Sequence, residues 1–252
     1  MLKVGLHGAS GRMGQEIADI IKSSPQRYAL SFTKVSEKDL QDKTRHYTVF
    51  PETTTAQVVI DFTIPEASME LLTWCLKQKI ALVIGTTGFN PEQLAKITDA
   101  AQEIPILMSP NMSLSVNALF KLVETVTRYL PQAEVEIIES HHRHKKDAPS
   151  GTGLRLGEAV AAARGQKLSE VAVFDRHGVD NFRKPDEIGF AVVRGGDIVG
   201  KHTVSFILNG EELNLTSEIT NRKSFAEGAL VAAEYVTRQP AGFYTMNDVL
   251  GL

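Results

Sequence analysis

Short apolar runs alternate with helical patterns along the first half of the chain. Lys3–His7 is such a run, a glycine turn follows it, and apolar residues then recur at helical spacing from Met13 to Ile21. The same alternation predicts further strands at Tyr28–Lys34, Val58–Phe62, Ala81–Ile84 and Ile106–Met108. Strands that alternate with helices are typical of a parallel sheet. The pattern therefore predicts an α/β fold with a Rossmann-like parallel sheet.

The pattern changes from Glu134 onward, where strand-like segments follow one another with few helices between them. These segments are Val135–Glu139, Val171–Phe174, Ile188–Arg194, Thr203–Leu208 and Glu211–Ser217. Asn209 and Gly210 are a strong turn signal and predict a hairpin that joins the last two strands. We therefore expect an α+β domain with a mixed or antiparallel sheet at residues 113–221.

The end of the chain is expected to return to the first domain. Ser224–Glu227 reads as a capping box that opens a final helix to about Thr237, and the tail Phe243–Leu252 follows it. The first domain would then comprise residues 1–112 and 222–252. An open sheet in the second domain tends to bury its free face or edges against a neighbour, which predicts a homo-oligomer.

A glycine motif lies between the first strand and the first helix. It reads Gly8-Ala9-Ser10-Gly11-Arg12-Met13-Gly14. In a dinucleotide site the first glycine permits a tight turn, the second lets a pyrophosphate approach the backbone, and the third lets the helix pack closely. The spacing G-x-x-G-x-x-G leaves an ordinary strand–helix turn as the alternative interpretation.

Three predicted turns, Gly8–Met13, Gly85–Thr87 and Ser109–Met112, follow the carboxyl ends of parallel strands. Ligands bind at this edge of such sheets.

Lys34 ends the second strand, where a basic group accommodates the 2′-phosphate of NADPH and an acid favours NADH. The cofactor is therefore NADPH, NADH or both, with acceptance of NADPH favoured; the alternative is that Lys34 is a solvated strand end. The candidate cofactor residues are Gly8, Ala9, Ser10, Gly11, Arg12, Met13, Lys34, Gly85, Thr86, Thr87, Ser109, Pro110, Asn111 and Met112.

The most chemically informative segment is Glu139–Thr152. Three of the seven histidines, an arginine and two lysines lie between His141 and Lys146. Ser150-Gly151-Thr152 then opens a predicted helix, whose free N–H groups favour an anion. Imidazole and ammonium groups beside an anion site suggest proton transfer to a small acidic substrate.

Other interpretations of this charged segment carry less weight. A solvated loop is the usual fate of a short charge run. A metal site is disfavoured because neighbours on an extended segment point opposite ways and no Cys, Asp or Glu has zinc-ligand spacing around the histidines. Nucleic-acid binding would call for a high pI, whereas the pI here is about 6.2.

Composition narrows the class of protein. The chain has 252 residues, a net charge of -3 and a hydrophobic content of 42%, which is ordinary for a globular protein. Its single cysteine, Cys75, excludes a disulfide within the chain and is expected in a helix. No apolar run approaches the roughly 20 residues of a membrane span. We expect a cytoplasmic protein that binds neither membrane nor nucleic acid.

The chain resembles the 4-hydroxy-tetrahydrodipicolinate reductase (dihydrodipicolinate reductase) family of lysine and diaminopimelate biosynthesis. The string His-His-Arg-His-Lys-x-Asp-Ala-Pro-Ser-Gly-Thr is highly specific to that family, and the other matches run in order along nearly the whole chain. The matching segments are Gly8–Gly14, Asp61–Thr63, Gly85–Phe89, Pro110-Asn111, Glu139–Thr152, Arg194–His202, Phe225–Gly228 and Met246–Leu250.

The resemblance implies NAD(P)H-dependent reduction of a six-membered cyclic imine with two carboxylates. It implies that His141 is the acid/base and Lys145 the proton donor, and which of them delivers the proton stays open. His142, Gly151 and Thr152 would hold the substrate carboxylates, and the protein would be a homotetramer assembled through its C-terminal sheets. The chain departs from the family pattern at Lys34, in the connection before Val58, and in Lys201 and the loop 175–187.

Three other classes of protein are alternative interpretations of the sequence. A semialdehyde dehydrogenase with a covalent intermediate needs a cysteine on a loop, and Cys75 is expected in a helix. A non-enzymatic dinucleotide sensor has no need of His141, Lys145 and the anion site together. A scaffold module that uses the C-terminal sheet would bind no nicotinamide.

Overall fold

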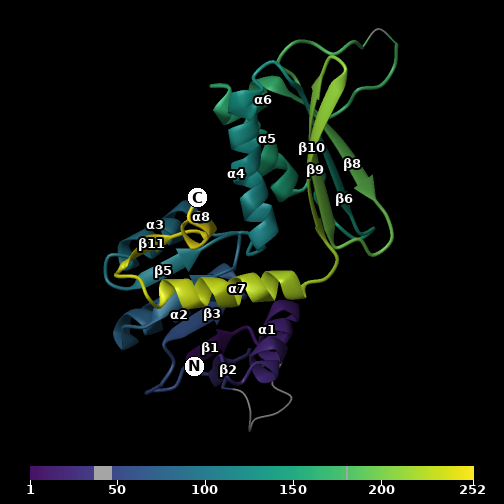
Figure 1. Ribbon diagram of the computed structural model, residues 1–252. Helices are drawn as coiled ribbons and strands as arrows, with labels where there is room; N and C mark the ends of the chain where they lie inside the picture. The colour runs from purple at the N-terminus through teal and green to yellow at the C-terminus, as the bar shows by residue number, and fades with distance from the viewer. Residues whose placement is uncertain (37–46, 180) are drawn as a thin grey trace. The chain divides into compact units, whose positions relative to one another are not determined.

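The computed structural model describes residues 1–36, 47–179 and 181–252 and divides the chain into two compact units (Figure 1). Unit 1 comprises Met1–Leu114 and Arg222–Leu252, and unit 2 comprises Ser115–Asn221. Within the described residues, no helix has both the length and the apolar character needed to cross a bilayer.

Unit 1 is built on a parallel sheet with the order β11-β5-β4-β3-β1-β2. The strands are β1 (Leu2–His7), β2 (Tyr28–Lys34), β3 (Val58–Asp61), β4 (Ala81–Ile84), β5 (Pro105–Met108) and β11 (Gly242–Tyr244). The first five confirm the predicted strands to within one residue. Because β1 lies between β2 and β3, the strand order runs both ways from it, which creates a switch point at its carboxyl end.

Helices cover both faces of this sheet. Alternate residues of a strand point to opposite faces, so Val58 joins the core with α1 and α7, whereas Val59 joins the core with α2 and α3. The helices are α1 (Arg12–Ser23), α2 (Pro65–Gln78), α3 (Pro91–Ala100), α7 (Lys223–Val236) and α8 (Met246–Leu250). The structure confirms the predicted Rossmann-like architecture.

Helix boundaries are set locally in one case and by packing in another. At α3, Asn90 and Gln93 form a reciprocal capping box before Pro91, which favours a helix start at this point. The capping box predicted at Ser224–Glu227 is wrong: α7 begins at Lys223, two residues before the start that a Ser224 cap would give, and Arg222 precedes it without a side-chain cap. The helix is instead held by an inward face of small residues that is almost fully buried.

Unit 2 contains a mixed sheet, as predicted, with the order β10-β9-β6-β8-β7. Its strands are β6 (Glu134–His141), β7 (Ala172–Val173), β8 (Ile188–Arg194), β9 (Gly200–Leu208) and β10 (Glu211–Ile219). The central strand β6 runs parallel to β8 and antiparallel to β9. The predicted hairpin is present, since Leu208 pairs with Glu211 across a turn in which Gly210 has a φ of 86°.

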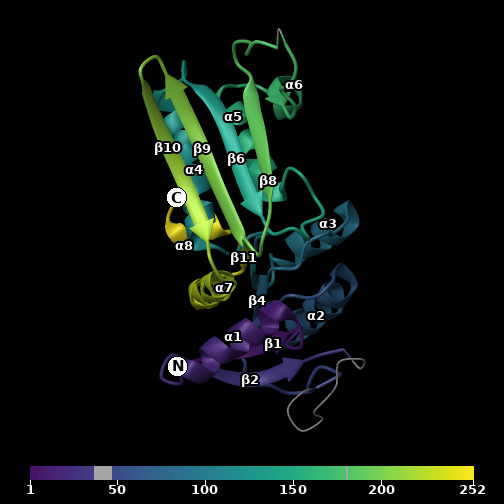
Figure 2. The same cartoon turned by 90° about the vertical axis from the view of Figure 1, so that its right-hand side faces the viewer.

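Two helices, α4 (Leu114–Tyr129) and α5 (Gly151–Ala163), lie on one face of this sheet, and Figure 2 shows its other face without a helix in the described part of the chain. The strand predicted at residues 171–174 is wrong in part, because the short helix α6 (Leu168–Val171) precedes the two residues of β7.

Strand β6 extends two residues beyond its predicted end. The ladder continues because His141 pairs with Arg194 of β8. Burial alternates along β6, so Glu139 and His141 point to the same buried side as Val135 and Ile137. Two polar side chains therefore enter the helix-covered face of the sheet.

The glycine turn of unit 1 generates a stability prediction. A Cβ on Gly14 would lie 2.2 Å from the carbonyl oxygen of Gly8 and 2.6 Å from Cα of Ala9. Gly14→Ala is therefore expected to lower the free energy of unfolding by about 1–3 kcal/mol, the usual cost of overpacking. In Gly11→Ala the new Cβ would meet only the Gly8 oxygen, at 3.2 Å, so this matched control should lose clearly less in urea unfolding. Equal losses in the two variants would show that α1 does not depend on this close approach.

Candidate active site

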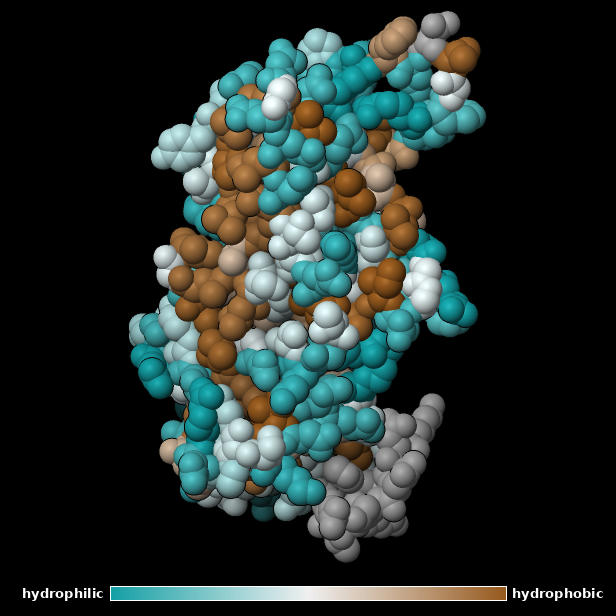
Figure 3. Space-filling model, turned by 45° about the vertical axis from the view of Figure 1, so that its right-hand side comes forward, coloured by the Kyte–Doolittle hydropathy of each residue, from teal (hydrophilic) through white to brown (hydrophobic). Residues whose placement is uncertain are grey.

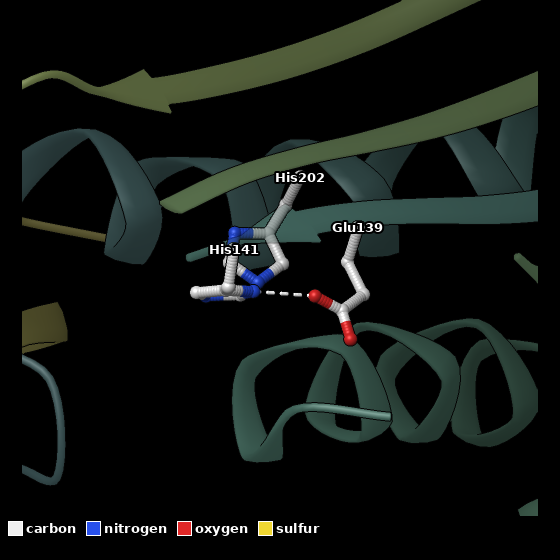
Figure 4. Close-up of side chains that lie close together, drawn as sticks. All are labelled: Glu139, His141 and His202. Atoms are coloured by element: carbon white, nitrogen blue, oxygen red, sulfur yellow. Dashed lines mark hydrogen bonds and ion pairs between the residues drawn. The ribbon is translucent and has the colours of Figure 1, made fainter. Parts of the chain in front are cut away.

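A cluster of polar side chains lies at the carboxyl end of β6 and gathers residues from four segments. Figure 4 shows its members Glu139, His141 and His202. Glu139 and His141 come from β6, Arg194 ends β8, His202 comes from β9, and Ser150 precedes α5. Glu139, His141, Ser150 and His202 are all at least nine-tenths buried. The cluster is therefore part of the interior of unit 2.

Glu139 is the hub of this cluster. Its carboxylate accepts hydrogen bonds from Arg194 Nη2 at 2.7 Å and Nη1 at 2.9 Å, from the Ser150 N–H at 3.0 Å, and from His141 Nδ1. Burial alone would raise the pKa of Glu139, but the hydrogen bonds from Arg194, His141 and Ser150 outweigh it and hold the pKa below its usual value. Glu139 is therefore an ionised carboxylate at neutral pH.

His141 faces this carboxylate through Nδ1. An ionised carboxylate only accepts hydrogen bonds, so Nδ1 carries the proton, and Nε2 is the basic atom of the neutral ring. Burial lowers the pKa of His141 below its usual value, against the opposing effect of Glu139, and the charges of Lys145 and Arg194 lower it further. His141 is therefore predominantly neutral at pH 7 in the free protein.

His202 is a partner of His141 that the sequence analysis did not single out as a site residue. The two rings meet edge to face with their centroids 5.0 Å apart, and His202 Nε2 lies 3.1 Å from Ser150 Oγ. Burial, followed by the neighbouring His141, lowers the pKa of His202 to about 4, which keeps this ring neutral. The inward alternation of β9 is the signal that could have indicated its place.

The cluster also has the composition of a metal site. Glu139, His141 and His202 each offer a ligand atom within 4.8 Å of the others. However, Arg194 already holds both carboxylate oxygens, and its guanidinium charge opposes a cation at the same place. The arrangement is better suited to hold and move a proton than to bind a metal.

The loop between β6 and α5 carries the remaining candidates of unit 2. Ser150 caps α5, because its Oγ accepts a hydrogen bond from the Gly153 N–H at 3.1 Å. Asp147 Oδ1 lies 2.8 Å from Lys145 Nζ, and Asp147 Oδ2 accepts the Gly151 N–H at 3.3 Å. The hydrogen bond from Lys145 is the main cause of the lowered pKa of Asp147. An internal carboxylate thus contacts Lys145, the predicted proton donor, and the N–H of Gly151, which is predicted to hold a substrate carboxylate.

The other two predicted substrate residues lie near this anion site. Thr152 follows Gly151 in the first turn of α5. His142 is partly buried, and its Nδ1 is sealed from solvent without a hydrogen-bond partner among the described residues. Both residues therefore stay within the segment for which anion binding is predicted.

The predicted cofactor residues all lie in unit 1. Gly8 has a φ of 84°, and a Cβ on it would lie 2.4 Å from the Phe62 carbonyl oxygen, so the turn requires glycine. Gly11 precedes α1 without a side-chain cap, which leaves N–H groups at the helix start for an anion. The turns at Gly85–Thr87 and Ser109–Met112 follow β4 and β5 at the same edge of the sheet.

Lys34 is not a solvated strand end, since it is only 9% exposed. Its Nζ lies 3.4 Å from His7 Nε2 and 4.5 Å from the centre of the Phe50 ring. His7 Nδ1 in turn lies 2.9 Å from Asp61 Oδ1, although the geometry is not that of a hydrogen bond. His7 and Phe50 thus hold Lys34 at the end of β2, and sequence reasoning had singled out neither of them.

Asp61 links the turns of unit 1. It is fully buried, and its carboxylate accepts hydrogen bonds from Thr63 Oγ1 at 2.7 Å, from Thr86 Oγ1 at 2.8 Å, and from the Ser68 hydroxyl. The Thr86 hydroxyl also accepts the Thr63 N–H at 2.8 Å. The ends of β3 and β4 are therefore fastened to one another beside the glycine turn.

Comparisons with known proteins cover both parts of the chain. The family models for the N-terminus and the C-terminus of dihydrodipicolinate reductase match residues 2–112 and 115–250. A 4-hydroxy-tetrahydrodipicolinate reductase from Nitrosomonas europaea is 41% identical over 264 residues, which span 100% of this chain and 98% of the relative.

Solved structures agree with these matches. A dipicolinate-bound dihydrodipicolinate reductase from Paenisporosarcina sp. TG-14 is 25% identical, with a TM-score of 0.78 over 97% of each chain. A probable dehydrogenase from Thermotoga maritima is 12% identical, with a TM-score of 0.63 over 98% of this chain and 92% of the other, and is similar in fold alone. From the family models and the full-length relative together, the chain belongs to the dihydrodipicolinate reductase family.

Proposed function

We propose that the protein reduces 4-hydroxy-tetrahydrodipicolinate to tetrahydrodipicolinate with NADH or NADPH, a step of lysine and diaminopimelate biosynthesis. The observation that carries the proposal is the Glu139–His141 pair beside Lys145 and the start of α5. These groups offer a proton-exchanging imidazole and an anion site within one short segment. Family membership supports the same reaction.

Unit 1 would hold the nicotinamide cofactor. The pyrophosphate would accept hydrogen bonds from the N–H groups at the start of α1, where Gly8 and Gly11 allow the backbone to approach it closely. Gly85–Thr87 and Ser109–Met112 would line the cofactor at the same edge of the sheet. Lys34 would contact the 2′-phosphate of NADPH, for which its basic Nζ is chemically suited. The cofactor supplies a hydride when bound.

Unit 2 would hold the dicarboxylate substrate. Lys145, His142 and the N–H groups of Gly151 and Thr152 would bind its carboxylates. Because Asp147 forms an ion pair with Lys145 and accepts a hydrogen bond from the Gly151 N–H, a substrate carboxylate that binds these groups would take its place. Substrate binding would thus exchange one carboxylate for another.

The proton that follows hydride addition would come from His141 or Lys145. Two negative charges brought close to the neutral His141 ring favour its imidazolium form. His141 would then take up a proton on substrate binding and return it through Nε2 as charge develops on the substrate ring. Lys145, an ammonium group in the same loop, is the second donor.

Other two-domain dehydrogenases and a dinucleotide sensor fit this site less well. A covalent semialdehyde dehydrogenase needs an accessible thiolate, whereas Cys75 is fully buried in α2, and this burial raises its pKa well above the usual value. A sensor without chemistry gives no reason for a histidine held by a buried ion pair.

The uncovered face of the unit 2 sheet supports assembly into a homotetramer. Ile138 and Val193, which are 39% and 46% exposed, belong to the face opposite the buried row of β6, and Ile207 accompanies them on β9. Figure 3 shows hydrophobic side chains (brown) among polar ones over this unit. A second copy of the same sheet would bury such a mixed face. A monomer in sedimentation analysis would exclude this assembly.

The reaction itself can be measured in a coupled assay. The purified protein is expected to oxidise NADPH and NADH when the substrate is generated in situ from pyruvate and aspartate semialdehyde by a coupling synthase. Because Lys34 suits the 2′-phosphate, kcat/KM with NADPH should at least equal that with NADH. A folded protein that binds dinucleotide but shows no synthase-dependent oxidation would contradict the proposed reaction and favour a dinucleotide sensor or another dehydrogenase.

His141→Ala is expected to lower kcat by about 10²–10⁴-fold, the usual contribution of general acid–base catalysis, while the affinity for NADPH stays the same. Steady-state kinetics and fluorescence titration of NADPH measure the two effects. His144→Ala is the matched control, because His144 is an exposed imidazole of the same loop and should keep its activity. Loss of NADPH affinity with normal kcat in His141→Ala would exclude the assignment.

Asp147→Asn is expected to tighten inhibition by dipicolinate, a planar dicarboxylate, by a few-fold. The variant removes the charge that competes for Lys145, and an exposed ion pair is worth roughly 1 kcal/mol or less. Asp175→Asn makes the same charge change at an exposed site on another loop and should leave the inhibition constant unaltered. Weaker inhibition of Asp147→Asn would instead mean that Asp147 holds Lys145 in its binding position.

A further inference from the structure

We propose that Glu139, held by Arg194, is a positioning residue that fixes the tautomer of His141 and presents its Nε2 for proton exchange. The inference rests on the reductase function proposed above and adds to it the residue that prepares the histidine.

The orientation of Glu139 is fixed from three directions. Arg194 of β8 donates to both carboxylate oxygens, the Ser150 N–H before α5 donates to one of them, and His141 donates to the other. Arg194 is itself anchored, since Nη1 donates to the Val193 carbonyl and Nη2 to the Asp147 carbonyl, each at 2.8 Å. A carboxylate with this set of donors has one stable orientation.

This orientation decides which nitrogen of His141 can react. The hydrogen bond to Glu139 uses Nδ1–H, so Nε2 remains to exchange a proton. Gly200 faces this nitrogen, and a Cβ there would lie 3.2 Å from Nε2. The absence of a side chain at Gly200 therefore leaves room beside the reactive atom.

Charges around the ring give Glu139 a second role. The groups that face His141 are Glu139 on its own strand, Arg194 on β8, His202 on β9 and Lys145 in the following loop. Arg194 and Lys145 oppose the imidazolium, and His202 is neutral near pH 7. Glu139 is the one group among these four that stabilises the protonated ring.

A purely structural role for the Glu139–Arg194 ion pair is the competing explanation. Such a pair ties β6 to β8, and removing Arg194 would leave the buried charge of Glu139 without its cation. Loss of activity alone would not separate the two explanations. The titration and the tautomer of His141 do separate them, because a structural pair has no need to set either.

The first test is Glu139→Gln in the full-length protein. We expect kcat to fall by about 10²-fold with NADPH affinity unchanged, as for a disabled acid–base group. We also expect the limb of the pH profile of kcat/KM that belongs to His141 to move to lower pH, because the variant removes the charge that favours the imidazolium. An unmoved limb in an active variant would overturn the proposal.

Glu136→Gln is the matched control. Glu136 lies on the same strand and forms its own ion pairs, with Arg176 at 2.9 Å and with Arg183. It points to the opposite side of the strand from Glu139. This variant should keep the kcat and the pH profile of the wild type, and an equal shift in both variants would show that the effect is not specific to Glu139.

A second measurement reads the tautomer in the wild-type protein itself and uses a variant only to assign the signals. In wild-type protein with ¹⁵N-labelled histidine, the ring nitrogens of His141, assigned with His141→Gln, should report a protonated Nδ1 and an unprotonated Nε2 at neutral pH. The opposite tautomer would overturn the proposal. This result does not depend on turnover, whereas an inactive wild type in the synthase-coupled assay would reject the proposed reaction and leave the tautomer result standing.

Discussion

The carboxylate of Glu139, fully removed from water, is the constraint on which the site in unit 2 depends. A buried carboxylate is tolerated only when donors replace the lost hydration. Here the donors come from three segments: the end of β8, the residue before α5, and β6 itself. Satisfying one charge therefore fixes where the loop after β6 returns to the sheet. The fold of this loop and the orientation of His141 therefore depend on the same carboxylate.

Unit 1 uses the same device with a different residue. Asp61 ends β3 in full burial, and the hydroxyls of Thr63, Ser68 and Thr86 satisfy its oxygens. The bond to Thr86 fastens the turn after β4 to the end of β3, next to the glycine turn. A dinucleotide site made of backbone N–H groups needs turns with a fixed conformation. Hydrogen bonds to a buried carboxylate are directional, so they fix these turns more closely than apolar packing alone.

Local signals in the sequence were sufficient for the strands of unit 1, because alternation and turn chemistry act within a few residues. They also singled out the segment from His141 to Thr152 as a candidate site, because its polar residues are contiguous in sequence. They were insufficient for Arg194 and His202 as site residues, because only the pairing of β6 with β8 and β9 brings these side chains to Glu139. The capping box at Ser224 failed for a similar reason: the inward face of α7, packed in the core of unit 1, set the helix start.

Glu139 and Asp147, the two carboxylates of the candidate site, differ in burial and therefore in the role that each can have. Arg194 is paired with Glu139, and Lys145 is paired with Asp147. The Asp147 side chain is 54% exposed, so transferring its charge fully to water costs little. The Glu139 side chain has no exposed surface, whereas that of Arg194 is 20% exposed, so separating the two would leave a buried carboxylate without its cation. The proposed dianionic substrate would therefore replace Asp147 more readily than Glu139. The exposed carboxylate is exchangeable, and the buried one stays in place to hold the histidine.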